Sequence, residues 1–105
     1  MIKTTILCCD EGTVIGFTIK YHGDPIVCAA VSLLVINTFN SIEKLTGLTE
    51  RDYHCKYDDS GGFIDFSLND PNMRDTGAGI LLDAMVLGLE SVKQHYPKEI
   101  KIEAR

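Results

Sequence analysis

Alternating apolar and polar positions predict four short β-strands in this chain. They run from Ile2 to Cys8, from Thr13 to Lys20, from Tyr53 to Tyr57 and from Phe63 to Leu68. Polar and glycine-rich turns join the strands in two pairs, at residues 10–12 and 58–62. Ile100 and Ile102 mark a short final strand.

Two longer apolar stretches predict helices. The first is expected from Pro25 to Leu45, with Asp24 as its N-cap, and the second from about Thr76 to His95. A polar loop is expected between them, over Asn69 to Asp75. The order ββαββαβ predicts an α+β fold, in which two long apolar helices cover a mainly antiparallel sheet.

Both predicted helices are apolar on more than one side, which is typical of helices that are buried from several directions. The chain has 105 residues, is 45% hydrophobic and is expected to form a single domain over 1–105. In so small a domain, a second subunit can bury the apolar helix surfaces that the sheet does not cover, so we expect a homodimer. The alternative is tight packing of the two helices on each other and on the sheet.

Net charge and cysteine spacing limit the kinds of molecule that this protein is expected to bind. A formal net charge of −5 argues against a general nucleic-acid binder and suits a basic protein partner. The N-terminus has no signal-peptide pattern, so we expect a cytoplasmic protein with reduced thiols and no membrane partner. The four cysteines show no zinc-binding spacing, and neither a metal nor a cofactor is expected.

The candidate chemistry lies at the start of the first helix, where Cys28 follows His22 by six residues. The N-cap Asp24 and the following Pro25 place Cys28 in the first helical turn, near unpaired N–H groups and the positive end of the helix dipole. A thiol in that position ionises more easily, and the thiolate is its nucleophilic form. The turn at 23–25 favours an approach of His22 to the sulfur.

Magnitudes show why the histidine matters. A helix dipole contributes roughly 0.3–1 kcal/mol at an exposed site, and one pKa unit corresponds to about 1.4 kcal/mol. The helix start alone therefore shifts the pKa of a cysteine thiol by less than one unit. A thiolate–imidazolium pair requires His22 beside Cys28. The alternative is that Cys28 packs as a small hydrophobic residue while His22 is an exposed loop residue.

The run from Ile26 to Ser32, IVCAAVS, resembles the cysteine motif of the ribosomal-processing cysteine protease family known as Prp. The resemblance extends over most of the chain. It implies that Cys28 is the nucleophile, that His22 is the general base and that Ser32 is the motif serine one turn beyond the cysteine. It also implies a homodimer, and a substrate that is the N-terminal segment of a large-subunit ribosomal protein.

The chain departs from the family motif around the histidine. Tyr21 replaces a glycine, Gly23 replaces an alanine, Pro25 replaces an aspartate, and most of the variable loop after the histidine is missing. Asp24 is the nearest carboxylate and a candidate to orient the histidine, in addition to its expected role as helix cap.

We therefore predict a cysteine endopeptidase that acts on an N-terminal peptide segment, with no direct contact to nucleic acid. The alternative is a catalytically weak or inactive dimeric binding protein on the same scaffold, associated with ribosome assembly. A third possibility is a redox-sensing or metal-binding protein that uses the four cysteines.

Overall fold

The computed structural model describes residues 1–20, 23–58 and 62–105. Within these residues, five strands form one sheet in the order β3-β4-β2-β1-β5. Their bounds are β1 (Ile2–Cys8), β2 (Val14–Lys20), β3 (Tyr53–Tyr57), β4 (Phe63–Leu68) and β5 (Ile100–Ala104). Neighbouring strands are antiparallel except β1 and β5, which are parallel. The predicted ββαββαβ order and the mainly antiparallel sheet are confirmed.

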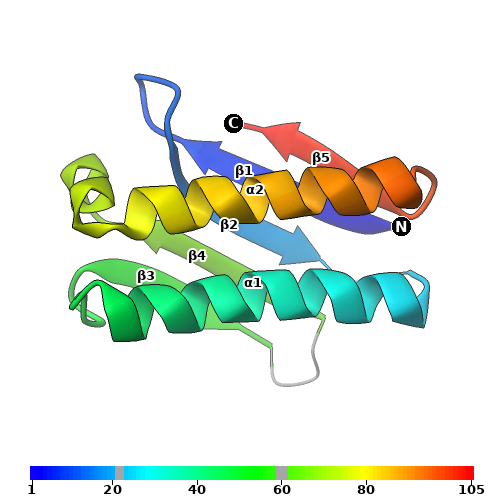
Figure 1. Ribbon diagram of the computed structural model, residues 1–105, viewed down its shortest axis with the longest axis horizontal. Coiled ribbons are helices and arrows are strands. Elements are labelled where there is room, and N and C mark those ends of the chain that lie inside the picture. The colour runs from blue at the N-terminus through cyan, green and yellow to red at the C-terminus, as the bar shows by residue number, and fades with distance from the viewer. Residues whose placement is uncertain (21–22, 59–61) are drawn as a thin grey trace.

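Two helices, α1 (Pro25–Leu45) and α2 (Ala78–His95), lie side by side on one face of this sheet (Figure 1). Strand alternation explains the arrangement, because every second residue of β1, β2 and β4 points toward the helices. The core between the layers includes Ile2, Ile6, Phe17, Ile19, Ile64, Phe66 and Leu68 from these strands, and Val27, Val31, Val35, Leu82, Met85 and Leu89 from the helices.

The expected polar loop over Asn69 to Asp75 is wrong in part, because the chain forms a 3₁₀ helix, η1 (Pro71–Thr76). Asp70 caps it: its carboxylate accepts a hydrogen bond of 2.9 Å from the N–H of Asn72. Proline also suits the first helical position. Gly77, with a φ of 107°, then separates η1 from α2, so α2 begins at Ala78 rather than at Thr76.

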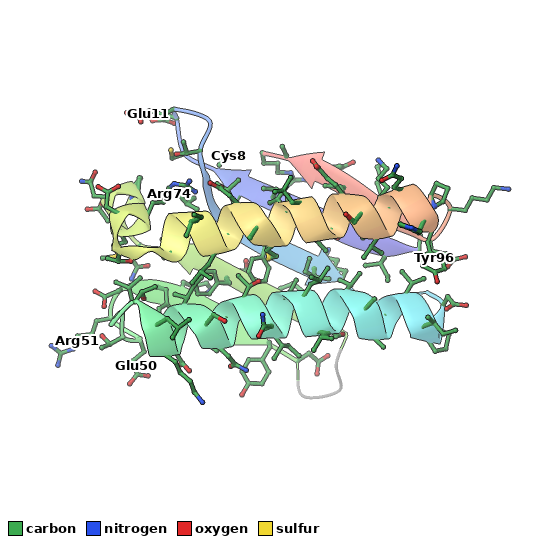
Figure 2. All side chains as sticks on the ribbon, viewed as in Figure 1. Cys8, Glu11, Glu50, Arg51, Arg74 and Tyr96 are labelled. Atoms are coloured by element: carbon green, nitrogen blue, oxygen red, sulfur yellow. The ribbon has the colours of Figure 1, made fainter. Side chains whose placement is uncertain are left out.

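Glycines let the helices approach their neighbours closely. A Cβ atom on Gly88 of α2 would lie 2.8 Å from Leu34 Cδ2 of α1, so the missing side chain allows α1 and α2 to pack together. The space beside Gly79 is taken by Arg74. The Arg74 guanidinium donates to the carbonyl oxygen of Val14 and pairs with Asp83 at 2.8 Å, which ties η1 to β2 and α2 (Figure 2).

The outer surfaces of both helices remain apolar. The exposed side chains there include Ile26, Leu33, Ile36 and Leu45 on α1 and Ile80 and Leu87 on α2. By length and composition α1 could also cross a membrane, with a mean hydropathy of 1.8 over its most apolar window. One side of the helix nevertheless packs in the core, through Val27, Val31, Val35, Thr38 and Ile42.

Four aromatic rings form the part of the core beneath the C-terminal half of α1. Phe66 stacks on Phe17 with ring centroids 5.5 Å apart, and contacts Tyr53 at 5.3 Å and Phe39 at 5.7 Å. The Tyr53 hydroxyl donates a hydrogen bond of 2.8 Å to the Glu43 carboxylate. Burial, followed by this hydrogen bond and the charge of Glu43, raises the pKa of Tyr53 to about 12.

Replacing Tyr53 with phenylalanine tests this contact through the pH dependence of stability. The folded protein favours the neutral phenol of Tyr53. The contribution of this phenol to the free energy of unfolding is therefore fully present below the unfolded pKa of about 10, and it is lost as pH rises toward 12. In urea titrations at neutral pH, we expect Tyr53→Phe to lose about 1 kcal/mol of unfolding free energy. The difference in unfolding free energy between the native protein and Tyr53→Phe should narrow or reverse between pH 10 and about 12. A difference that is constant over this interval would contradict the assignment.

Candidate functional site

Asp24 caps the start of α1. Its Oδ1 accepts hydrogen bonds from the backbone N–H groups of Ile26 at 2.9 Å and Val27 at 3.3 Å. Its carbonyl oxygen accepts the N–H of Cys28 at 2.9 Å, which is the first bond of the helical ladder. The predicted N-cap is confirmed, and the cap fixes Cys28 in the first turn of the helix.

The same bonds affect the electrostatics of the helix start. A helix leaves its first N–H groups without intrahelical partners, and these are the groups that stabilise anions. Here the N–H groups of Ile26 and Val27 donate to the Asp24 carboxylate, and Pro25 has none to offer. A developing oxyanion at this helix start therefore competes with Asp24 for these donors.

Cys28 is half-buried and packs against the core. Residues four apart in a helix share a face, so Cys28, Ser32, Ile36 and Asn40 form one stripe along α1. Three of these residues, from Ser32 onward, line a pocket of about 320 Å³. The thiol therefore lies one helical turn before the pocket, in line with its helical wall.

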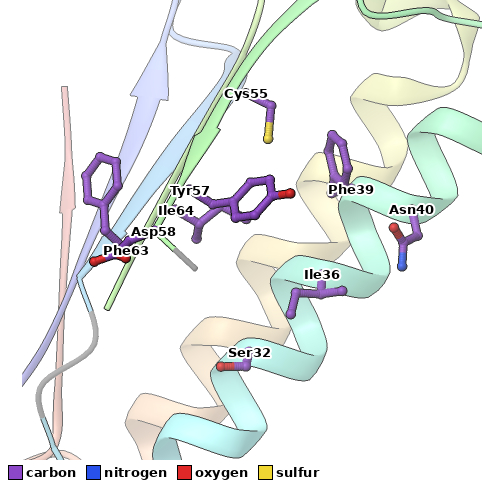
Figure 3. Close-up of a pocket in the computed structure, with 9 residues that line it drawn as sticks. All are labelled: Ser32, Ile36, Phe39, Asn40, Cys55, Tyr57, Asp58, Phe63 and Ile64. Atoms are coloured by element: carbon purple, nitrogen blue, oxygen red, sulfur yellow. The ribbon is translucent and has the colours of Figure 1, made fainter. Parts of the chain in front are cut away.

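The pocket lies between α1 and the β3–β4 end of the sheet (Figure 3). The Cys55 sulfur and the Tyr57 ring point toward α1 from β3, while Phe39 and Ile36 face them from the helix. Apolar side chains dominate this lining, and the Ser32 hydroxyl lies at the end nearest Cys28. The remaining lining residues are Asn40, Asp58, Phe63 and Ile64. Such a cavity suits a large apolar side chain.

His22, the predicted general base, lies outside the described residues, as does Tyr21, so its pairing with Cys28 stays a prediction. Gly23 and Asp24, which follow, lie against Ile2 and Glu99, at the β1–β5 side of the sheet. The N–H of Asp24 donates to Glu99 Oε2 at 3.4 Å. A Cβ on Gly23 would lie 3.4 Å from Ile2 Cγ1 and 3.6 Å from Glu99 Oε2. The entry into α1 is thus held beside the beginning of β1.

The other cysteines occupy separate environments, and all four are free thiols. Burial, with smaller contributions from the charges of Asp65 and Glu43, raises the pKa of Cys55. Cys9 forms a 2.9 Å hydrogen bond with the Thr13 hydroxyl, and this bond is the main reason that its pKa is lowered. No group of three or more histidine, cysteine, aspartate or glutamate side chains able to hold a metal ion occurs among the described residues.

The pocket wall contributed by the sheet was not predicted from the sequence. Cys55 and Tyr57 alternate on β3 as any half-buried strand would. Their proximity to α1 depends on the strand order, which places β3 at the edge of the sheet next to β4. The spacing of Ser32, Ile36 and Asn40 on one stripe was the available signal for the helical half of the pocket.

Comparison with known proteins identifies the family and agrees with the fold. A family model described as cysteine protease Prp matches residues 1–101. The ribosomal processing cysteine protease Prp of Staphylococcus aureus strain Mu50 is 29% identical over 108 aligned positions, which cover 97% of each chain.

Two solved structures of the S. aureus essential ribosomal processing protease Prp share the fold. One is in complex with a covalently linked product peptide and superposes with a TM-score of 0.84. The other contains a substrate peptide and has a TM-score of 0.83. Each is 28% identical in sequence to this chain, and each alignment covers all of both chains.

Two substitutions of Asp24 separate its capping role from a role beside the histidine. Asp24→Ala removes the cap and is expected to cost about 1 kcal/mol of unfolding free energy, whereas Asp24→Asn keeps a capping oxygen and costs a few tenths at most. Urea titration measures both values. Equal losses in the two variants would contradict capping by Asp24. A reactivity of Cys28 that falls in the asparagine variant, which keeps the cap but loses the charge, would assign the carboxylate a further, charge-dependent role.

Proposed function

Because the chain belongs to the cysteine protease Prp family, we propose that it is a cysteine endopeptidase with Cys28 as nucleophile and His22 as general base. The observation that carries the proposal is the position of Cys28 in the first turn of α1, on the stripe that continues through Ser32 into the apolar pocket. A nucleophile one helical turn before an apolar pocket is suited to a peptide with a large apolar residue near the scissile bond.

The proposed reaction follows the chemistry of a thiol and an imidazole. His22 takes the proton of the Cys28 thiol, and the thiolate attacks the carbonyl carbon of the scissile bond. As the tetrahedral intermediate collapses, the C–N bond breaks and the imidazolium gives its proton to the leaving amine. His22 then removes a proton from water, and the resulting attack on the thioester releases the acyl product and restores the thiol.

The pocket provides the proposed specificity. A peptide that lies along α1 would place a side chain two or more residues from the scissile bond between Ile36 of the helix and Tyr57 of β3, because Ile36 lies about 12 Å beyond Cys28 along the helix. The names of the relatives, ribosomal processing proteases, support a ribosomal protein as the substrate, and we propose that its N-terminal segment is cleaved. Such a substrate is made in the cytoplasm, which is where we propose that the protein acts.

A second candidate function is peptide binding without cleavage, by a dimeric protein associated with ribosome assembly. The occupied amides at the start of α1 favour it, because the N–H groups of Ile26 and Val27 are bonded to Asp24 and Pro25 carries none. Loss of one oxyanion-hole donor lowers kcat by roughly 10²–10³-fold in other hydrolases. Such a protein would retain the pocket and the affinity for peptide while turning over slowly.

The reactivity of Cys28 tests the dyad directly. Iodoacetamide labelling, followed by peptide mapping in a mass spectrometer, reports Cys28 separately from the three other cysteines across a pH series from about 5 to 9. We expect His22→Ala to slow the labelling of Cys28 at neutral pH, because the thiolate loses its imidazolium partner. His54→Ala is the matched control. His54 lies on β3, with its Nε2 3.6 Å from Asp65 Oδ2, and its removal should leave Cys28 labelling unchanged.

Cleavage distinguishes the two candidate functions. Peptides that span the first residues of the large-subunit ribosomal proteins of the same organism are incubated with the native protein, and the products are read by mass. Cys28→Ala should abolish cleavage but retain binding, and His22→Ala should lower the rate by roughly 10²–10⁴-fold. Binding without cleavage by the native protein, together with unchanged labelling in His22→Ala, would reject the protease and favour the binding protein.

We also propose a homodimer, formed through the outer surfaces of the helices. Ile26 and Leu33 on α1 are 69% and 73% exposed, and Ile80 and Leu87 on α2 are 74% and 66% exposed. Each pair is seven residues apart, so each forms one apolar stripe on the solvent side of its helix. Apolar surface of this kind is typical of a face that is covered by a protein partner.

Light scattering after size-exclusion chromatography tests the dimer. The native protein is expected to elute at about twice the chain mass of 11.6 kDa, and Leu33→Glu combined with Leu87→Glu should shift it to the monomer. Thr5→Glu adds a carboxylate on the opposite face of the sheet and should leave the dimer intact. A native protein that elutes as a monomer at micromolar concentration would contradict the proposal.

A further inference from the structure

The face of the sheet opposite the helices carries a row of lysines that the proposed protease chemistry does not use. In the described part of the chain, both helices lie on the other face (Figure 1). The strand register pairs Lys3 of β1 with Lys20 of β2 on one side and with Lys101 of β5 on the other. Adjacent strands are about 5 Å apart, so three like charges stand side by side across the sheet.

The chain concentrates positive charge here despite its acidic composition. Lys3, Lys20, Lys101 and Arg105 line one polar hollow of about 200 Å³, and they are four of the ten lysine and arginine residues. Among the described residues that line it, Glu103 is the only acidic one; its carboxylate pairs with the Lys101 ammonium at 2.9 Å. Like charges directly opposite one another destabilise a sheet. Lys3, between two other lysines, therefore costs stability that an anionic ligand would restore.

An aromatic side chain continues the row of lysines. The register pairs Phe63 of β4 with Lys20, and Figure 3 shows the Phe63 ring on the side of the sheet away from α1. Thr5 and Thr18 stand in the next row and also line the hollow. The register flanks them with Glu103 and Asp65, and the Thr18 hydroxyl donates a hydrogen bond of 2.9 Å to Asp65 Oδ1. An aromatic ring beside several cations and hydroxyl groups on an open sheet is the combination with which sheet surfaces bind single-stranded nucleic acid, by stacking a base and pairing its phosphates.

We propose that this face binds single-stranded RNA, with Lys3, Lys20 and Lys101 on successive phosphates and Phe63 stacked on a base. The net charge of −5 argues against general nucleic-acid binding, but it averages over the whole surface, whereas the lysine row is local. An acidic peptide would use the lysines but would gain little from Phe63. The helices and most of the pocket lie on the other face, and Phe63, which also lines the pocket, is where the two surfaces meet.

Fluorescence anisotropy with a labelled oligouridylate of roughly ten nucleotides measures this binding. Three phosphate contacts predict a slope of log affinity against log salt of about −2, or a roughly 20-fold loss between about 50 and 200 mM salt. The combined substitutions Lys3→Gln, Lys20→Gln and Lys101→Gln should remove most of that slope and weaken binding at low salt by at least about tenfold. Phe63→Leu should weaken it by roughly tenfold while retaining the slope.

Lys44→Gln, Lys93→Gln and Lys98→Gln form the matched control. These exposed lysines lie on or beyond the helices, and their loss changes the net charge equally. Binding in this control should change by less than about twofold. Circular dichroism confirms that each variant is folded. Absence of salt-dependent binding by the native protein, or equal loss in both triple variants, would overturn the proposal. Equal affinity for an oligoglutamate of the same charge, with no effect of Phe63→Leu, would reject RNA in favour of an acidic peptide.

Discussion

The close contact between the two helices is the constraint on which the rest of the structure depends. One face of a small sheet has to bury the apolar sides of both α1 and α2, and this requires the helices to approach each other closely. Gly88 lies at this contact, because a Cβ atom there would lie 2.8 Å from Leu34 Cδ2 and would require the Leu34 side chain to move. With α2 contacting β2 and β5, α1 is left over the β3–β4 end of the sheet. The pocket forms there, so helix packing determines where the proposed peptide site lies.

The start of α1 uses one group of backbone donors for two purposes that conflict. The Asp24 carboxylate stabilises the helix by accepting the N–H groups of Ile26 and Val27, and this fixes the position of Cys28. The same N–H groups are those that a helix start offers to an anion. A tightly capped helix therefore positions the proposed nucleophile well and stabilises an oxyanion poorly. Donors for a transition state would then have to come from another segment or from a rearranged cap.

Local chemistry in the sequence determined much of the fold, and long-range contacts explain what could not be predicted. Strands β3 and β4 and helix α1 have the predicted bounds, because their alternation and the Asp24–Pro25 cap are local signals. The 3₁₀ helix at Pro71 was missed because its polar residues resemble those of a loop. Cys28 and Ser32 share a stripe, as their spacing predicts. The approach of Cys55 and Tyr57 to that stripe depends on strand order, which no local pattern specifies.

The parallel pairing of β1 with β5 has a consequence for how the chain folds during synthesis. A ribosome delivers β1 and β2 first, and they can pair at once as a hairpin. The other edge of β1 stays unpaired until β5 is made. The pairing of these two strands begins with Ile2 opposite Ile100. Contacts between residues so far apart in sequence form slowly. Until they form, β1 presents an open edge to other nascent chains, and Lys3, which stands on that strand, discourages edge-to-edge pairing. Ile100 is a core residue, and it joins the core only after β5 has been synthesised.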